Sequence, residues 1–449
     1  MKLIKLIFPL ILLLSGCSKY LDLKPDNRMA VPQTLADCEL LLNDYSTMNT
    51  GFSSLGESGT DDFFIESGNY EALTDMDEKN AYIWSNEPVS SDFQWQSTYK
   101  VVFVSNQILA VLNDLPQKTG NDNKKVLGAA HFYRAFAFHQ IAEVFCLPYE
   151  ESKASSTPGI PIRTMPSLEG RSLRSDLRTS YEQIIADYKI AAANLPVAEN
   201  KKGRPARAAA YAALARVYLG MQRYEEAYKY ADSCLRLQAR LIDFNTLNTS
   251  DEFPIQRFNT EVLFPATTGY SDLMQYYYAR VSPELYESYA DADLRKVLFF
   301  EPSYSDESTY GITASYDNYP TGIFIGLTTS EAYLIRAEAA ARLGRNTVAL
   351  VDLNTLLKNR METAAFQPVT EDDPLALLKL ILLERRKELV SRGRRWADLK
   401  RLNQDSRFAK ELTRSVNGKT FTLKPGSLNY AVLIPQKVID LTGMEQNRR

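Results

Sequence analysis

The sequence predicts a mainly α-helical protein, made of antiparallel helix hairpins that are split along the chain by long irregular insertions. Three features of the 449 residues support this class. Several long segments carry apolar side chains at steps of three and four residues, which is the period of one helix face. A pair of alanines twelve residues apart occurs twice, and the residues between the two copies are rich in aromatic and turn-forming types.

The first residues form an export signal. Residues 1–5 carry positive charge, residues 6–14 are almost wholly apolar, and Ser15 and Gly16 precede Cys17. So short an apolar run cannot span a membrane, and small residues before a cysteine are typical of a bacterial lipoprotein signal. We expect cleavage after Gly16 and acylation of Cys17, which would anchor the protein to a membrane. An ordinary secretory signal with an incidental cysteine is the alternative.

Residues 17–35 lack a helical period and are expected to form an extended tether from the lipid to the body. Removal of residues 1–16 leaves 50 Lys and Arg against 55 Asp and Glu, a net charge of −5. This charge argues against nucleic acid as a partner. The remaining unacylated cysteines, Cys38, Cys146 and Cys234, are odd in number and far apart, which excludes a disulfide framework.

Four long helices are predicted after the tether. The helical period begins near Thr34, and residues 92–115 then carry a continuous apolar stripe. Residues 124–145 are apolar on most sides, so this helix is expected in the middle of the core. Residues 176–195 and 205–219 form the next two helices.

The two alanine pairs mark two helix hairpins of the tetratricopeptide type. Ala215 and Ala227 belong to the first hairpin, and Ala337 and Ala349 belong to the second, which begins near Glu331. Small residues at these places let the two helices of a hairpin approach closely. The two copies lie 122 residues apart, far from a tandem period of about 34 residues. The scaffold is therefore a split helical repeat and not a regular array.

We divide the body into an N-terminal helical-repeat part (36–240), an aromatic-rich irregular insertion (241–330) and a C-terminal helical part (331–449), which together form one compact unit. Long irregular insertions are usually functional or disordered, and aromatic richness argues against disorder. The binding surface is therefore expected in residues 241–330, and residues 50–91 are a second stretch of similar character.

No motif supports catalysis, a cofactor or a metal site. The only histidines, His131 and His139, lie on one predicted helix without carboxylate or cysteine ligands at suitable spacing, so we expect them to pack in the core. The triplet Gly418-Lys419-Thr420 lacks the earlier glycine that a phosphate-binding loop needs, because Thr413 stands there.

The densest charged run lies between Glu384 and Arg401. Its spacing predicts pairing of Glu384 with Lys387 and of Glu388 with Arg392 along one helix. We expect these groups to join helix ends. A basic patch for phosphate or lipid headgroups is the alternative.

The sequence as a whole resembles the SusD/RagB family of nutrient-uptake lipoproteins from the outer membrane of Bacteroidetes. The similar segments follow one another in order along the whole chain: Trp95 and Tyr99 leading to Asn106, Arg134-Ala135-Phe136, Leu147-Pro148-Tyr149, Gly203 to Ala210, Glu331 to Glu338, Leu353-Asn354 with Arg360, Glu384 to Arg386, Asp398 to Arg401, Ile434-Pro435 and Gln446-Asn447. Each segment alone is a weak signal, and their common order carries the resemblance.

The resemblance implies a helical-repeat scaffold whose irregular insertions form a ligand surface. It implies a protein without enzymatic activity or cofactor that is lipid-anchored at the outer membrane, is exposed at the cell surface and captures oligosaccharides. The implied partner is a TonB-dependent transporter of the SusC type. A helical-repeat lipoprotein that binds a peptide or a protein is the alternative function, and a hydrolase is a weaker third.

Sugar rings stack on aromatic side chains, so loop aromatics are the expected ligand contacts. Trp84 lies in a loop near where the relatives place ligand aromatics, and the other candidates are Tyr70, Tyr82, Tyr276, Tyr277, Tyr278 and Tyr316. The alternative for each is that it pins its loop to the body. Trp95 lies on an apolar helical stripe and is expected to pack in the core.

Overall fold

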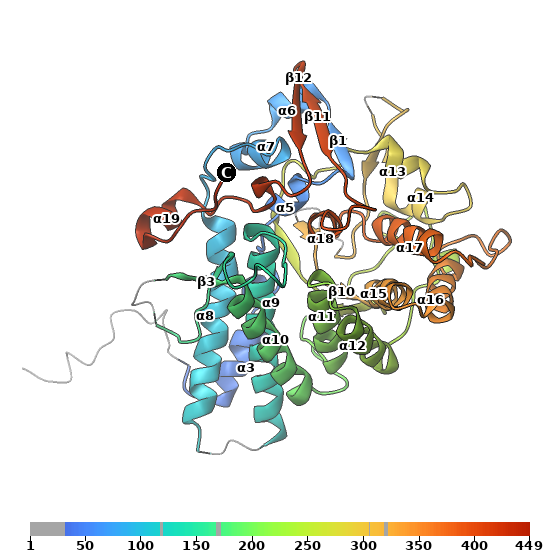
Figure 1. Cartoon of the computed structure of the whole chain (residues 1–449). Helices are drawn as coiled ribbons and strands as arrows, with labels where there is room; N and C mark the ends of the chain where they lie inside the picture. Colours follow the sequence, from blue (N-terminus) through green and yellow to red (C-terminus); the bar gives the residue numbers. More distant parts are fainter. Residues whose placement is uncertain (1–31, 117–119, 168–171, 305, 318–321) are drawn as a thin grey trace, which may run out of the picture.

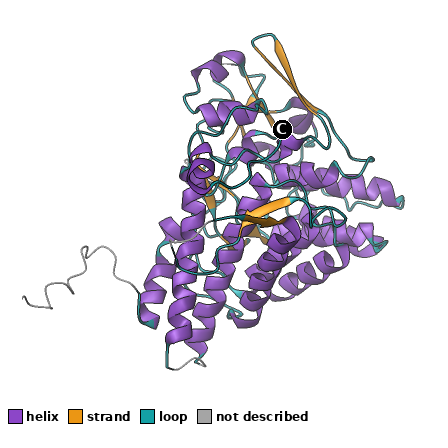
Figure 2. Cartoon of the chain, turned by 60° about the vertical axis from the view of Figure 1, so that its left-hand side comes forward, coloured by secondary structure: helices purple, strands orange, loops and turns teal. Residues whose placement is uncertain are grey.

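The computed structural model describes residues 32–116, 120–167, 172–304, 306–317 and 322–449. The predicted signal, Cys17 and nearly all of the predicted tether lie outside these ranges. Helices dominate the described part, and its strands are short (Figure 2). The protein is mainly α, as the sequence predicts.

Five long helices form the N-terminal part: α8 (Phe93–Asp114), α9 (Asn121–Phe145), α10 (Leu177–Asn194), α11 (Arg207–Gly220) and α12 (Tyr224–Leu237). Each packs against the next one in chain order (Figure 1). The predicted bounds of α8, α9, α10 and α11 agree with these within a few residues. Helix α9 lies in the middle of the core, because Phe132, Phe136 and Phe138 on its different sides are all buried.

The C-terminal part contains α15 (Thr329–Arg342), α16 (Asn346–Lys358), α17 (Pro374–Glu388), α18 (Arg395–Leu402) and α19 (Gln436–Thr442). Helix α15 packs against α12 (Figure 1), so the two predicted hairpins are neighbours in space. The alanines of both pairs are fully buried. The chain between the hairpins is therefore an excursion from one continuous stack of helices.

Shorter elements complete the fold. The short helices are α3 (Leu35–Asn43), α4 (Tyr45–Met48), α5 (Leu55–Ser58), α6 (Ser67–Ala72), α7 (Met76–Tyr82), α13 (Pro283–Glu287) and α14 (Arg295–Phe299). The two-stranded pairs are β2 (Pro158–Pro161) with β3 (Arg174–Asp176), β4 (Val262–Phe264) with β10 (Leu327–Thr328), β5 (Thr267–Tyr270) with β9 (Gly322–Phe324), and β11 (Leu412–Val416) with β12 (Lys419–Leu423).

One four-stranded sheet joins the two aromatic stretches that the sequence singled out. Its order is β1 (Phe63–Ile65), β6 (Ala279–Val281), β8 (Tyr310–Ile312) and β7 (Phe300–Pro302). Strand β1 pairs antiparallel with β6, and Phe64 lies opposite Arg280. The stretch expected to be irregular is therefore partly ordered as strands. Local sequence patterns did not reveal these strands, because β1 and its partner β6 are more than 200 residues apart in the chain.

Buried arginine and carboxylate groups attach this sheet region to the C-terminal helices. The Arg360 guanidinium donates to Glu388 at 2.9 Å and to Glu261 at 2.7 Å, and all three side chains are fully buried. Arg295 donates to Glu384 at 2.6 Å. Removal of one partner from such a network leaves an uncompensated buried charge, so the pairs fix how the insertion sits on the helices.

The charged run therefore serves the fold, and one predicted pair in it is wrong. Lys387 does bond Glu384 at 2.8 Å. Helix α17 ends at Glu388, however, and Glu388 pairs with Arg360 and not with Arg392. The sequence spacing assumed a helix that continued one turn further.

Candidate functional site

Two of the aromatic residues predicted to touch ligand, Trp84 and Tyr82, lie in the interior. Trp84 is 8% exposed, and its indole Nε1 donates to the carbonyl oxygen of Gly59 at 2.9 Å. The hydroxyl of Tyr82 accepts a hydrogen bond from the backbone N–H of Ile65 at 2.8 Å, and the Arg414 guanidinium lies 3.7 Å from the Tyr82 ring centre. These contacts fix the segment around α5 to α7 against strand β11.

Tyr316 is buried as well. Its hydroxyl donates to Glu261 at 3.0 Å, and the Arg392 guanidinium stacks 3.2 Å from the ring centre. Burial raises the pKa of Tyr316, so the phenol remains a protonated donor. Ligand contact by Trp84, Tyr82 and Tyr316 stays a prediction, and their burial favours the alternative that these rings pin loops to the body.

Three tyrosines of the insertion face solvent together. Tyr270, Tyr276 and Tyr277 are 54%, 41% and 44% exposed, and we call them the tyrosine surface. The rings of Tyr276 and Tyr277 lie edge to face with centres 5.4 Å apart. The Tyr270 hydroxyl donates to Asp272 at 3.3 Å, and the neighbouring Tyr277 phenol raises the pKa of Tyr270. Tyr270 was not among the predicted contacts, and its place at the end of β5 is what exposes it.

The remaining two candidates lie behind this surface. Tyr278 is half-buried against the core of the insertion, and its ring centre is 4.7 Å from that of Tyr277. Tyr70 is half-buried on α6, with its ring centre 5.9 Å from that of Tyr82. The Asn69 side chain donates to the backbone carbonyl of Tyr277 at 3.4 Å, which places α6 beside the tyrosine surface.

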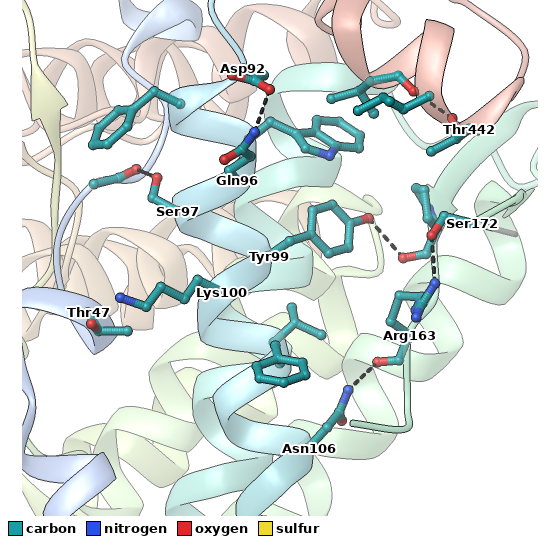
Figure 3. Close-up of a pocket in the computed structure, with 18 of the residues that line it drawn as sticks. Thr47, Asp92, Gln96, Ser97, Tyr99, Lys100, Asn106, Arg163, Ser172 and Thr442 are labelled. Carbon is teal, nitrogen blue, oxygen red and sulfur yellow. Dashed lines mark hydrogen bonds between the residues drawn. The ribbon is translucent and has the colours of Figure 1, made fainter. Parts of the chain in front are cut away.

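A hollow of about 790 Å³ lies along the first half of α8, and we call it the α8 groove (Figure 3). Its walls come from α4 and the turn after it, from α19, and from Pro161, Arg163, Met165, Ser167 and Ser172. The volume falls within the range of small-molecule sites in proteins. No local sequence pattern indicates this groove, because its walls come from segments that are far apart in the chain.

Aromatic side chains form the floor of the α8 groove. Trp95, Tyr99 and Phe103 follow one another at steps of four residues and so share one face of α8. Figure 3 shows Tyr99 on the side of this helix that faces Ser172. Trp95 packs edge to face on Phe145 with ring centres 5.0 Å apart, and it is buried as the sequence predicts. The Tyr99 hydroxyl donates to the carbonyl oxygen of Pro161 at 2.8 Å, so it fixes one wall of the groove.

A hydrogen-bonded network supports the lower end of the groove. The Asn106 amide donates to the carbonyl oxygen of Arg163 at 2.9 Å and accepts a bond from Arg134 at 2.8 Å. Arg134 also donates to Asp187 at 2.6 Å, and His131 Nδ1 lies 2.7 Å from the same carboxylate. His131 therefore belongs to the packing of the helices.

Exposed apolar side chains surround the mouth of the groove. Phe93 on α8, Met165 on the loop wall and Leu441 on α19 are 64%, 71% and 76% exposed. Large apolar side chains that gather around a hollow are typical of binding surfaces.

No metal centre accompanies either surface in the part of the chain that the structure describes, where no three His, Cys, Asp or Glu side chains are grouped to hold an ion. The second histidine, His139, is buried in α9, and burial lowers its pKa to about 4. It is therefore a neutral core side chain at pH 7.

Comparison with known proteins gives consistent matches along the chain. A family model described as starch-binding and associating with the outer membrane matches residues 19–219, and one described as the SusD family matches residues 327–432. The SusD-like protein P2 of Formosa agariphila is 23% identical over 90% of this chain and 91% of its own length.

Solved structures share the fold. A SusD superfamily protein from Bacteroides thetaiotaomicron has a TM-score of 0.74 at 23% identity, covering 93% of this chain and 100% of its own. A putative sugar binding protein from Bacteroides vulgatus has a TM-score of 0.73 at 21% identity, with 93% and 99% covered. The sequence matches at both ends of the body and the shared helical architecture lead to one conclusion: the chain belongs to the SusD/RagB family.

Proposed function

We propose that this protein captures oligosaccharides at the outer membrane, without making or breaking bonds, for uptake by a TonB-dependent transporter of the SusC type. The observation that carries the proposal is the tyrosine surface, which presents open aromatic rings on a member of the SusD/RagB family. The relative from Bacteroides vulgatus bears the description of a sugar binding protein, which supports the same class of ligand.

Tyrosine suits a sugar ligand physically. The C–H faces of a sugar ring pack on an aromatic face, while a phenol hydroxyl exchanges hydrogen bonds with sugar hydroxyls. Tyr270, Tyr276 and Tyr277 offer both on one surface. Contacts of this kind give modest affinity for each sugar unit, which suits a protein that must release its ligand to a transporter.

The membrane part of the proposal rests on Cys17. Among the residues that the structure describes, no helix is long and apolar enough to cross a membrane. Lipid attached at Cys17 would supply the anchor, and more than one acyl chain makes such an anchor durable. The SusC-type transporter is the expected partner from the family alone.

Truncation of the tyrosine surface tests the proposal. Isothermal titration of the soluble mature body with a panel of gluco-, xylo- and manno-oligosaccharides should detect binding to the unaltered protein. The double variant Tyr276→Ala/Tyr277→Ala should bind about tenfold more weakly or worse, because two stacking faces are lost. Val351→Ala, which truncates an exposed apolar residue on α16, is the control and should bind normally.

Two outcomes would contradict the proposal. One is equal affinity of the double variant and the unaltered protein for every saccharide that binds. The other is binding of a peptide library with no saccharide bound, which would select the alternative of a helical-repeat protein for peptide or protein partners.

A further inference from the structure

We propose that the α8 groove continues the saccharide site, so that a long oligosaccharide lies on the tyrosine surface, passes Phe93 and ends in the groove. This inference rests on the proposed function and adds to it the path of the ligand and its minimum length. Three observations carry it: the contact between β5 and α8, the exposure of Phe93, and the chemistry of the groove.

Strand β5, which ends at Tyr270, lies against the start of α8, whose first residue is Phe93. A side chain at Gly269 would come within 3.8 Å of the Gln94 side chain. Tyr270 and Phe93 are the chain neighbours of these two residues, and both are more than half exposed. Tyr270 and Phe93, which lines the groove, are therefore each one residue along the chain from the place where β5 and α8 meet.

The aromatic rings in the floor of the groove are spaced at a distance that suits the successive units of a saccharide. Trp95, Tyr99 and Phe103 are separated by four residues each, which is a rise of about 6 Å per step along a helix. This step is comparable to the length of one sugar unit in a chain. The half-exposed rings of Tyr99 and Phe103 can therefore meet successive units of one ligand.

Polar groups border this apolar strip on both sides. On one side lie Thr47, Ser97 and Lys100, and on the other lie Ser172 and Thr442 (Figure 3). A sugar ring has apolar faces and a polar edge of hydroxyl groups, so a strip of rings with hydroxyl and ammonium groups along its borders matches it. An extended peptide is the competing ligand, and the experiments below separate the two.

Chain length is the first test. Affinity for the maltose, cellobiose and xylobiose series, measured by titration up to the octamer, should rise by about tenfold or more from the dimer to the octamer in the series that binds. In Phe93→Ala that rise should shrink to about threefold or less while the affinity for the dimer stays within about twofold of normal. The control is Lys379→Ala, which truncates an exposed lysine on α17 and should give the same affinities as the unaltered protein.

A probe inside the groove is the second test. Trp95 lies in its floor, whereas Trp84 and Trp396 are buried elsewhere. Fluorine NMR of the protein labelled with fluorotryptophan reports on each of these rings. The resonance that is missing from the Trp95→Phe variant belongs to Trp95. The octamer should shift the Trp95 resonance and the dimer should not. Tyr276→Ala/Tyr277→Ala should weaken binding of both.

The outcomes distinguish the two proposals. If no saccharide depends on the tyrosines, the proposed function fails. If saccharides bind through the tyrosines with the same affinity at every length, and no ligand moves the Trp95 resonance, only the extension into the groove is overturned. A Trp95 shift caused by peptides and by no saccharide overturns it too and assigns the groove to peptides.

Discussion

At the scale of single residues, Glu57 carries an unusual buried carboxyl group. It lies on α5 beside Asp62, Arg394 and Arg395, and neither carboxyl oxygen has a hydrogen-bond partner in the described structure. Burial, reinforced by the charge of Asp62, raises the pKa of Glu57 to about 8. The group is therefore mostly protonated at pH 7.

This pKa predicts a pH-dependent stability. The folded pKa lies above the ordinary 4.5, so the protonated form favours folding, and this contribution is complete below pH 4.5 and lost as pH rises to about 8. Urea unfolding at pH 5 and pH 9 measures the difference in unfolding free energy between Glu57→Gln and the unaltered protein. From pH 5 to pH 9 this difference should change in favour of the variant by on the order of a few kcal/mol, so that the variant is the more stable protein at pH 9. An identical pH dependence of the two proteins would show that Glu57 is not buried as a neutral acid.

The candidate site could be predicted only in part from its residues. The aromatic richness of the insertion singled out Tyr276 and Tyr277, which the structure exposes, and Tyr316, which is buried. Trp84 was expected to touch ligand from its place in a loop of the stretch 50–91, and it is buried as well. Composition gives the number of rings in a segment, but the neighbours that cover a ring come from distant parts of the chain, so exposure is a tertiary property.

At the scale of elements, Gly128 lets two helices meet. It lies within α9, and a Cβ atom there would come within 2.8 Å of the backbone nitrogen of Leu195, at the end of α10. Backbone atoms cannot move aside as a flexible side chain can. The close approach of α9 and α10 therefore depends on the absence of a side chain at this position.

Gly128→Ala should consequently destabilise the protein by about 1 to 3 kcal/mol, because overpacking outweighs the better helix propensity of alanine. The matched control is Gly220→Ala at the end of α11, where an added Cβ atom meets nothing within 4 Å and stability should be unchanged or slightly higher. Chemical unfolding of both variants measures the difference. Equal stabilities would mean that α10 shifts freely to accommodate the new methyl group.

Helices and strands differed in how well the sequence predicted them. Residues 92–115 were predicted as a helix and α8 spans Phe93–Asp114, because apolar period and helix length are local properties. Strands β1 and β6 were not predicted. Three residues are too few to show alternation, and pairing of Phe64 with Arg280 depends on a long-range contact.

At the scale of the whole molecule, the proposed lipid anchor at Cys17 predicts where the protein resides. Cys17→Ala should move the protein from the membrane fraction to the soluble fraction, because it removes the thiol to which the proposed lipid is attached. Ser18→Ala, which keeps the cysteine, should remain with the membrane. Immunoblots of fractionated cells measure both, and membrane retention of Cys17→Ala would contradict lipid anchoring at this residue.

The sequence by itself determined the helical class, the positions of the long helices and the resemblance to the SusD/RagB family, since each depends on patterns within a short stretch or on their order along the chain. Only the tertiary structure decided that α12 packs on α15 across a 91-residue excursion from 238 to 328, that Glu388 pairs with Arg360, and that Gly269 on β5 lies beside Gln94 at the start of α8. These features join residues far apart in the chain. Contact between them depends on packing of the complete fold, which no local pattern records.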